Sequence, residues 1–393
     1  MTGAGAREGS GPWRRPVLAG VVANLAVGSL FGWSLVAQPA TEAVGMSGGG
    51  AALVFASAIV VLTVVLLILG PLQRRAGSRR LLHAAAGLGG GGLLLAAMAQ
   101  HPLVLWIGVA LLFGAANGLA YGVAAGLATR VPPSRRGTAT GLVVSAYAAG
   151  PVLLGVVAPP AIDADRWRVS LAVLAVIVAV LLAGAAWLVP AGSPEPDRRG
   201  RHDHVPRRDV ALLWVVFAGG TAPGLLLFAH AVPVARHLQL SPQAAGLAVS
   251  ALAAGNLIGR LVVGAWSDRI GRLPAVALAL LTGAVSIVAL ALPTSAPVVL
   301  AGYLGTGLSY GAVSALVPAA TADRVGAAAF PTAYGVVFTG WGCAGLLAPL
   351  AGGQLLGLTE RQPALLILAV TPLIVASVAV VLLAERGPGQ VRS

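Results

Sequence analysis

The chain has 393 residues, of which 58% are hydrophobic and only 9% are charged, and its mean hydropathy is +0.90. So few charged side chains cannot cover a water-soluble globule of this size, so we expect an all-α protein embedded in a lipid bilayer. All of its basic side chains are arginines or histidines, because the sequence contains no lysine. This excludes a P-loop ATPase with a Walker A lysine and an enzyme that forms a Schiff base through lysine.

Apolar segments long enough to cross a membrane follow one another along the whole sequence. A helix of about 20 residues spans roughly 30 Å, the thickness of the hydrocarbon layer. Twelve such spans are predicted, at residues 16–38, 50–70, 81–99, 103–128, 137–159, 168–189, 210–235, 243–265, 273–293, 297–320, 330–357 and 363–384. The first is longer than the apolar part of a signal peptide, and eleven others follow, so we interpret it as a retained helix.

Arginines are distributed unevenly among the predicted loops. If both termini are cytoplasmic, 20 arginines fall in cytosolic segments, and only Arg166, Arg168, Arg236 and Arg361 fall outside. The positive-inside rule therefore predicts a multi-pass protein of the cell membrane with both termini in the cytoplasm. Spread over short loops beside an anionic leaflet, this charge does not indicate a nucleic acid partner.

The two halves of the sequence resemble each other. At an offset of 194 residues, GPLQRRAG (70–77) aligns with GAWSDRIG (264–271), and TATGLVVSAYAAG (138–150) aligns with TAYGVVFTGWGCA (332–344). At an offset of 189 residues, GLAYG meets GLSYG. The chain is therefore interpreted as a duplication of six helices.

A charged, proline-containing stretch separates the two repeats. We expect an N-terminal bundle at residues 1–190, a cytosolic linker at 191–209 and a C-terminal bundle at 210–393. Within the linker, His202 and His204 are interpreted as solvated side chains, so no metal site is predicted.

Two six-helix bundles joined by a cytosolic linker are the architecture of the major facilitator superfamily. Four stretches of the sequence are similar to particular families within this superfamily. The sequence resembles the oxalate/formate antiporter family and the bacterial monocarboxylate transporters in NLAVGSLFGWSLVAQP (24–39), NGLAYGVAAGLATRVPPSRRGTATGL (117–142), SDRIGR (267–272) and TAYGVVFTGWGCAGLLAPL (332–350). The resemblance implies a substrate site between the two bundles near the middle of the membrane.

Arg260 is the one arginine that falls inside an apolar span away from its ends. A guanidinium stays charged in proteins, and placing it at a helix centre costs at least about 2.5–3.5 kcal/mol, so it is expected to face a cavity or a partner. Arg260 lies eight residues before Asp268, or about 12 Å along the helix. Two interpretations stand: Arg260 binds a substrate anion, or it braces the fold. In the resembled families the matching arginine is thought to bind the substrate carboxylate.

Two further positions indicate the class of anion. Asn256 lies four residues before Arg260, where the monocarboxylate transporters usually carry an aspartate, and Trp341 stands where the oxalate exchanger has a lysine. One fixed positive charge balances one carboxylate, whereas a dianion would leave net charge in a medium of low dielectric constant. The sequence therefore predicts a monocarboxylate substrate.

Other candidate site residues lie on the spans that line the cavity in this superfamily. His230, which titrates near neutral pH, is a candidate for proton coupling, with ordinary packing as the alternative. Aromatic side chains could stack on or hydrogen-bond an organic acid, or simply pack between helices. These are Tyr121, Tyr310, Tyr334, Trp33 and Trp341.

Asp268, Arg269 and Arg272 form a charged cluster just after the eighth span. They are predicted to form a gate at the cytosolic mouth, because an aspartate there can pair with arginines or with a helix N-terminus. In the first repeat Arg74 stands at the position of Asp268, a departure from the superfamily pattern.

We therefore predict a monomeric, gradient-driven symporter or antiporter that needs no cofactor. The alternative is an efflux carrier for a larger amphipathic drug or metabolite, with Arg260 as a brace. An enzyme is not expected, because no span carries paired acids, an HExxH motif or a Ser/His/Asp set.

Overall fold

A computed structural model of the chain describes residues 13–46, 50–157, 166–189, 207–238, 240–291, 295–358 and 362–385. These residues form helices and connecting turns, with no strand among them. Seven α-helices lie in the first half: α1 (Arg14–Gly28), α2 (Ala37–Ala43), α3 (Gly50–Ala97), α4 (Pro102–Trp106), α5 (Gly114–Ala128), α6 (Arg136–Val157) and α7 (Trp167–Leu188). Six lie in the second half: α8 (Arg207–His237), α9 (Pro242–Ile258), α10 (Gly264–Ile270), α11 (Arg272–Ala291), α12 (Ala296–Leu358) and α13 (Gln362–Ala384).

The described helices account for the predicted membrane spans. Eight of the helical segments in the described residues are long and apolar enough to cross a membrane. The two longest, α3 and α12, are each divided by a glycine with positive φ, Gly77 (78°) and Gly326 (74°), so each contributes two spans. Side chains other than glycine rarely adopt this conformation, which explains the residue type at both bends. Each of the twelve expected segments thus coincides with a helix.

The internal repeat is visible in the backbone. Gly77 and Gly271 are 194 positions apart, and both adopt positive φ, 78° and 93°. The duplicated loop therefore keeps the same turn in both halves. Of the expected linker at 191–209, residues up to 206 lie outside the described part of the chain, and α8 already begins at Arg207.

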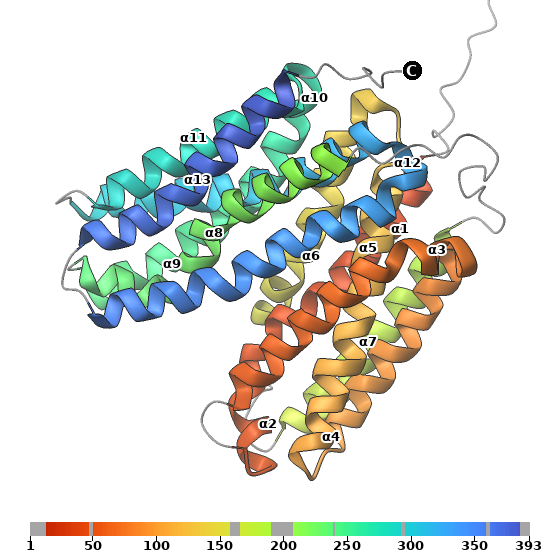
Figure 1. Ribbon diagram of the computed structural model, residues 1–393. Coiled ribbons are helices and arrows are strands. Elements are labelled where there is room, and N and C mark those ends of the chain that lie inside the picture. Colours follow the sequence, from red (N-terminus) through yellow and green to blue (C-terminus); the bar gives the residue numbers. More distant parts are fainter. Residues whose placement is uncertain are drawn as a thin grey trace, which may run out of the picture.

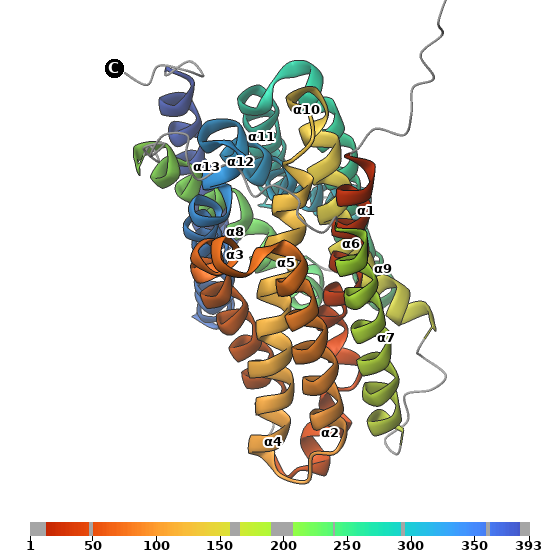
Figure 2. The same ribbon diagram turned by 90° about the vertical axis from the view of Figure 1, so that its right-hand side faces the viewer.

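The helices form two bundles inclined to each other, α1–α7 and α8–α13, with α6 at the boundary between them (Figures 1 and 2). Apolar side chains also cover much of the outer surface. On α7, for example, Val169, Val173, Val176 and Val180 are more than half exposed and lie along one face. A continuous apolar stripe of this kind suits contact with lipid rather than with water.

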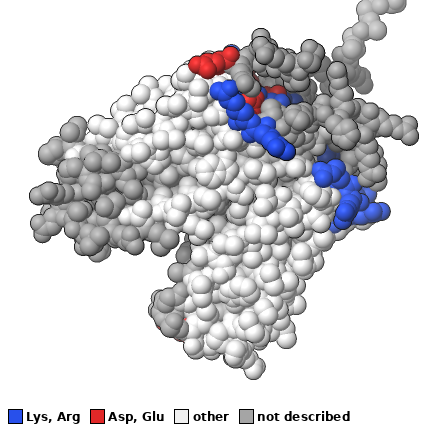
Figure 3. All heavy atoms as spheres, viewed as in Figure 1, with Lys and Arg blue, Asp and Glu red and all other residues white. Residues whose placement is uncertain are grey.

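One end of the molecule carries most of the described charges, and we call it the arginine-rich end. It includes the loops or helix ends that carry Arg74, Arg130, Arg136, Arg272 and Arg324. In Figure 3 the blue side chains gather at this end, while a notch separates the two bundles at the opposite end.

Contacts between the two bundles are concentrated toward the arginine-rich end. In the described part of the chain, hydrogen bonds join the halves at this end and also between Arg260 and Val144 and between Tyr121 and Tyr334. Those nearest the end are Asp268 with Gly137 and Thr138, Arg136 with Asp323, Arg74 with Thr332, and Arg272 with Pro133. The molecule is therefore closed at the arginine-rich end and open at the other.

Replacing Gly141 on α6 by leucine is expected to open this closed end. A Cβ at Gly141 would lie 2.5 Å from the carbonyl oxygen of Arg260, so the two bundles must move apart there. Spin labels on Met98 and Ser295, in a Cys343→Ser background, should report a shorter distance between the far ends of the bundles.

The matched control is Gly184→Leu on α7, where a Cβ would meet no atom within 4 Å. This variant should keep the wild-type distance distribution. An unchanged distribution in both variants would contradict the close approach at Gly141.

Candidate functional site

Arg260 lies at the boundary between the bundles, on a π-helical stretch, Gly259–Val263, that continues α9. Such stretches occur frequently at functional sites. The residue is only 6% exposed. Its Nε donates to Asn256 Oδ1 (2.8 Å), its Nη1 donates to the backbone oxygen of Val144 on α6 (2.8 Å), and its guanidinium lies 5.8 Å from the ring centre of Tyr310.

These contacts leave much of the guanidinium without a partner. A guanidinium has five N–H groups, and Arg260 donates two hydrogen bonds to described residues. Its Nη2 is not among the fully buried polar atoms that lack a partner, so this nitrogen remains accessible. No carboxylate pairs with Arg260 in the described residues. The site thus holds one positive charge with free donors, although the Val144 contact also fastens one bundle to the other.

The position of Arg260 is fixed by close packing of α9 against α12. A Cβ on Gly259 would collide with the carbonyl oxygen of Leu308, and a Cβ on Gly311 would collide with that of Asn256. Only glycine permits the two backbones to approach so closely. The segment that carries Asn256 and Arg260 therefore has little freedom to move relative to α12.

Four of the predicted aromatic residues lie together beside Arg260. The hydroxyls of Tyr121 (α5) and Tyr334 (α12) are 3.4 Å apart, which links the two bundles. Trp341 Nε1 donates to the hydroxyl of Tyr310 at 3.0 Å. Phe338 joins these pairs, because its ring contacts Tyr121, Tyr334 and Trp341. The site is therefore a cluster of buried aromatic side chains beside one cation.

Tyr147 and Asn117 belong to this site and were not predicted from the sequence. The ring of Tyr147 packs edge-on against Tyr121, and its hydroxyl donates to Asn117 Oδ1 at 3.0 Å. The internal repeat could have identified Tyr147 from the sequence, because Tyr147 lies 194 residues before Trp341 and occupies the equivalent position in the first half.

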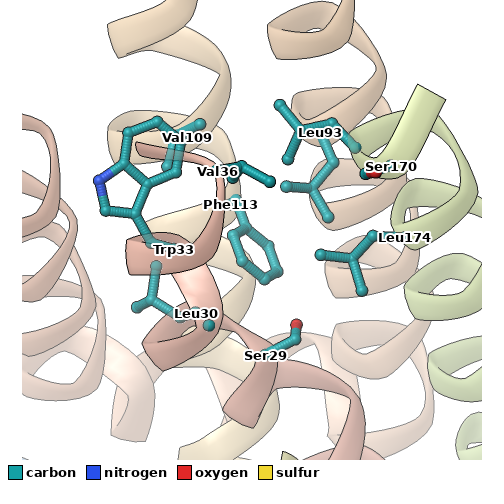
Figure 4. A pocket seen from close by; sticks show the side chains of 11 residues that line it. Ser29, Leu30, Trp33, Val36, Leu93, Val109, Phe113, Ser170 and Leu174 are labelled. Atoms are coloured by element: carbon teal, nitrogen blue, oxygen red, sulfur yellow. The ribbon is translucent and has the colours of Figure 1, made fainter. Parts of the chain in front are cut away.

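Trp33 lies elsewhere. It lines an apolar cavity of about 50 Å³ within the α1–α7 bundle, together with Leu30, Leu93, Val109 and Phe113 (Figure 4). The structure does not bring it together with Arg260. His230 is on α8, but its side chain lies outside the described residues, so proton coupling through it stays a prediction.

Asp268 joins the halves at the arginine-rich end. Its carboxylate accepts bonds from the backbone N–H groups of Gly137 and Thr138 (2.8 Å each) and from the Thr138 hydroxyl (2.7 Å), at the start of α6. A helix N-terminus favours a negative charge. Arg272 pairs with the same carboxylate at 2.7 Å and also with Asp323 at 3.1 Å. Asp268 and Arg272 thus lie where a gate would act.

The rest of the charged network departs from the sequence-based expectation. Arg136 of the first bundle pairs with Asp323 of the second, and neither residue was predicted. Arg269 is exposed and forms no ion pair with the described part of the chain. Arg74, at the position equivalent to Asp268, donates to the hydroxyl of Thr332 at 3.0 Å. Thr332 is itself the repeat equivalent of Thr138, so the two contacts are pseudo-symmetric.

Comparisons with known proteins agree with this architecture. A family model described as the Major Facilitator Superfamily matches residues 17–229 and, again, 212–393. The fold is similar to that of FucP, a Major Facilitator Superfamily transporter in the outward conformation, with a TM-score of 0.70, 14% identity, and coverage of 94% of this chain and 99% of that chain. It is also similar to a bacterial homologue of the iron transporter ferroportin in the outward-facing state, with a TM-score of 0.69, 14% identity, and coverage of 96% and 100%. No curated protein matches the sequence.

Proposed function

Because this chain belongs to the Major Facilitator Superfamily, and is thus a multi-pass membrane protein of a family of carriers, we propose that it transports a small organic monocarboxylate. The observation that carries the proposal is Arg260, a buried cation at the boundary of the bundles that pairs with no carboxylate in the described residues and retains an accessible nitrogen. In membrane proteins such residues usually mark substrate paths.

The surroundings of Arg260 favour a single negative charge and an apolar tail. Its described neighbours Asn256, Tyr310 and Val144 are neutral. One carboxylate would balance the guanidinium, whereas a second would remain unpaired in a site of low dielectric constant. The aromatic cluster that includes Phe338 and Trp341 supplies apolar groups that would contact the rest of the substrate.

We propose that the two halves, residues 1–190 and 210–393, rock about this site. The arginine-rich end is assigned to the cytosol and the protein to the cell membrane by the positive-inside rule. On this assignment the described state is closed to the cytosol and open to the outside. When the carrier turns inward, the pair of Arg136 with Asp323 and the bonds from Gly137 and Thr138 to Asp268 would break, because they join the two bundles. Proton coupling, as in a symporter, would involve His230.

A second candidate is efflux of a larger amphipathic compound. It is favoured by the size of the aromatic cluster and by the bond from Arg260 to Val144, which suits a brace. In that case small acids would not exchange, and export of the larger compound would not depend on the charge of Arg260.

The test is counterflow in proteoliposomes that contain the purified protein. Labelled lactate and benzoate should exchange against the same unlabelled acid inside the vesicles. Formate and oxalate serve as competitors. A pH step across the membrane tests proton coupling. Oxalate should compete weakly. If neither labelled acid exchanges while amphipathic dyes are exported, the efflux alternative replaces our proposal.

Replacing Trp341 by lysine is expected to shift selectivity toward dianions. Trp341 is 9% exposed and is bonded to Tyr310, whose ring lies beside Arg260, so a lysine there would add a second cation to the site. Competition by oxalate should become stronger, and that by lactate weaker. Trp341→Met, which removes the ring without adding charge, is the control. Equal selectivity in the two variants would show that the added charge does not reach the substrate.

A further inference from the structure

Ser145 on α6 has a buried hydroxyl without a partner. The residue is 4% exposed, and its Oγ is one of four fully buried side-chain atoms in the described residues that form no hydrogen bond. Many other helical hydroxyls donate to a backbone oxygen one turn earlier, as Thr140 does to Arg136 on the same helix. The Ser145 hydroxyl does not take this bond, so its donor is available to another partner.

Ser145 is close to Arg260. The preceding residue, Val144, supplies the backbone oxygen that accepts from Arg260 Nη1. Four residues earlier, Gly141 lies against the carbonyl oxygen of Arg260. Residues four apart share one side of a helix, so Ser145 lies one turn further along the side of α6 that faces Arg260.

We propose that the Ser145 hydroxyl donates a hydrogen bond to the same carboxylate that Arg260 binds. This inference rests on the proposed function. One oxygen of the anion would accept from the accessible Nη2 of Arg260, and the other from Ser145 Oγ. Because Ser145 belongs to the α1–α7 bundle and Arg260 to the other, the anion would bond both halves at once.

A merely structural role is harder to reconcile with these contacts. A buried hydroxyl that lacks a partner destabilises the protein without ligand, so packing alone would favour alanine at this position. The chain offers a comparison in Ser309 on α12, which is 2% exposed and also lacks a partner. Its Oγ lies against Gly283 of α11, inside one bundle and away from α6.

The experiment compares Ser145→Ala, Ser145→Thr and Ser309→Ala in the full-length protein. Binding of labelled lactate and benzoate is measured by scintillation proximity, and thermal unfolding is followed with and without each acid. Ser145→Ala should weaken binding about tenfold, as expected for loss of a hydrogen bond to a charged group. Its melting temperature without ligand should equal or exceed that of wild type. Ser145→Thr, which keeps the hydroxyl, should bind within about threefold of wild type. Ser309→Ala should leave binding unchanged.

The outcomes separate this inference from the proposed function. If wild type binds the acids and Arg260→Ala does not, but Ser145→Ala binds as wild type does, the role of Ser145 is wrong and the proposed function stands. Equal losses in Ser145→Ala and Ser309→Ala would also overturn the inference, because the effect would then be structural. If wild type binds neither acid, both proposals fail.

Discussion

Replacing Arg260 by alanine is expected to weaken the binding of lactate or benzoate by about a hundredfold or more, because a buried carboxylate would lose its only opposite charge. The affected quantity is the dissociation constant, measured by scintillation proximity on the purified protein. Arg260→Lys should recover only part of the affinity, since an ammonium keeps the charge but lacks the planar fork that bonds Asn256, Val144 and the anion together.

Arg168 provides the matched control. Like Arg260, it donates two hydrogen bonds to neutral oxygens, here the backbone oxygens of Ala97 (3.0 Å) and Ala99 (2.7 Å), and it lies over an aromatic ring, that of Trp167. It is far from the boundary between the bundles, so Arg168→Ala should lower the melting temperature and leave affinity unchanged. If Arg260→Ala behaves in the same way, Arg260 is a brace and the efflux alternative gains.

Replacing Asp268 by asparagine is expected to depopulate the state described here. The carboxylate accepts three hydrogen bonds from Gly137 and Thr138 across the boundary, and an amide in its place would direct its NH₂ group toward some of these donors. The equilibrium between the outward-open and inward-open states should shift by about tenfold or more. Spin labels on Met98 and Ser295 should report this shift as a larger fraction of short distances.

Transport should respond to this substitution differently from binding. Because Asp268 lies at the closed end and not beside Arg260, Asp268→Asn should change the rate of counterflow more than the dissociation constant. The control is Asp209→Asn, which removes an equally close ion pair, 2.8 Å to Arg324, that lies within one bundle. A large loss of affinity in Asp268→Asn with an unchanged rate would refute the assignment of Asp268 to a gate.

The helices could be predicted from the sequence because lipid imposes a strong and local rule. A span must be apolar over about 20 residues and must satisfy its backbone groups within itself, so hydropathy alone located the helices. The repeat added the equivalence of Gly77 with Gly271, whose shared backbone conformation follows from local chemistry.

The side-chain contacts depend on how the bundles dock, which no local pattern encodes. A helix that is apolar on all sides gives no signal for the face that it buries. For this reason Trp33 could not be assigned to the cavity inside its own bundle. The pairing of Arg136 with Asp323 joins residues 187 positions apart, and it exists only because the two halves meet at the arginine-rich end.

The pseudo-symmetric contacts of Thr138 and Thr332 have a consequence for the closed end. On one side of the closed end the bundles are joined by the acid Asp268, which bonds Thr138, and on the opposite side by the base Arg74, which bonds Thr332. Acid can neutralise a carboxylate, but a guanidinium keeps its proton at any pH that a cell meets. Acidification would therefore weaken the contact of Asp268 with Thr138 and leave that of Arg74 with Thr332 intact. The two bundles would then separate by rotating about the side that Arg74 holds.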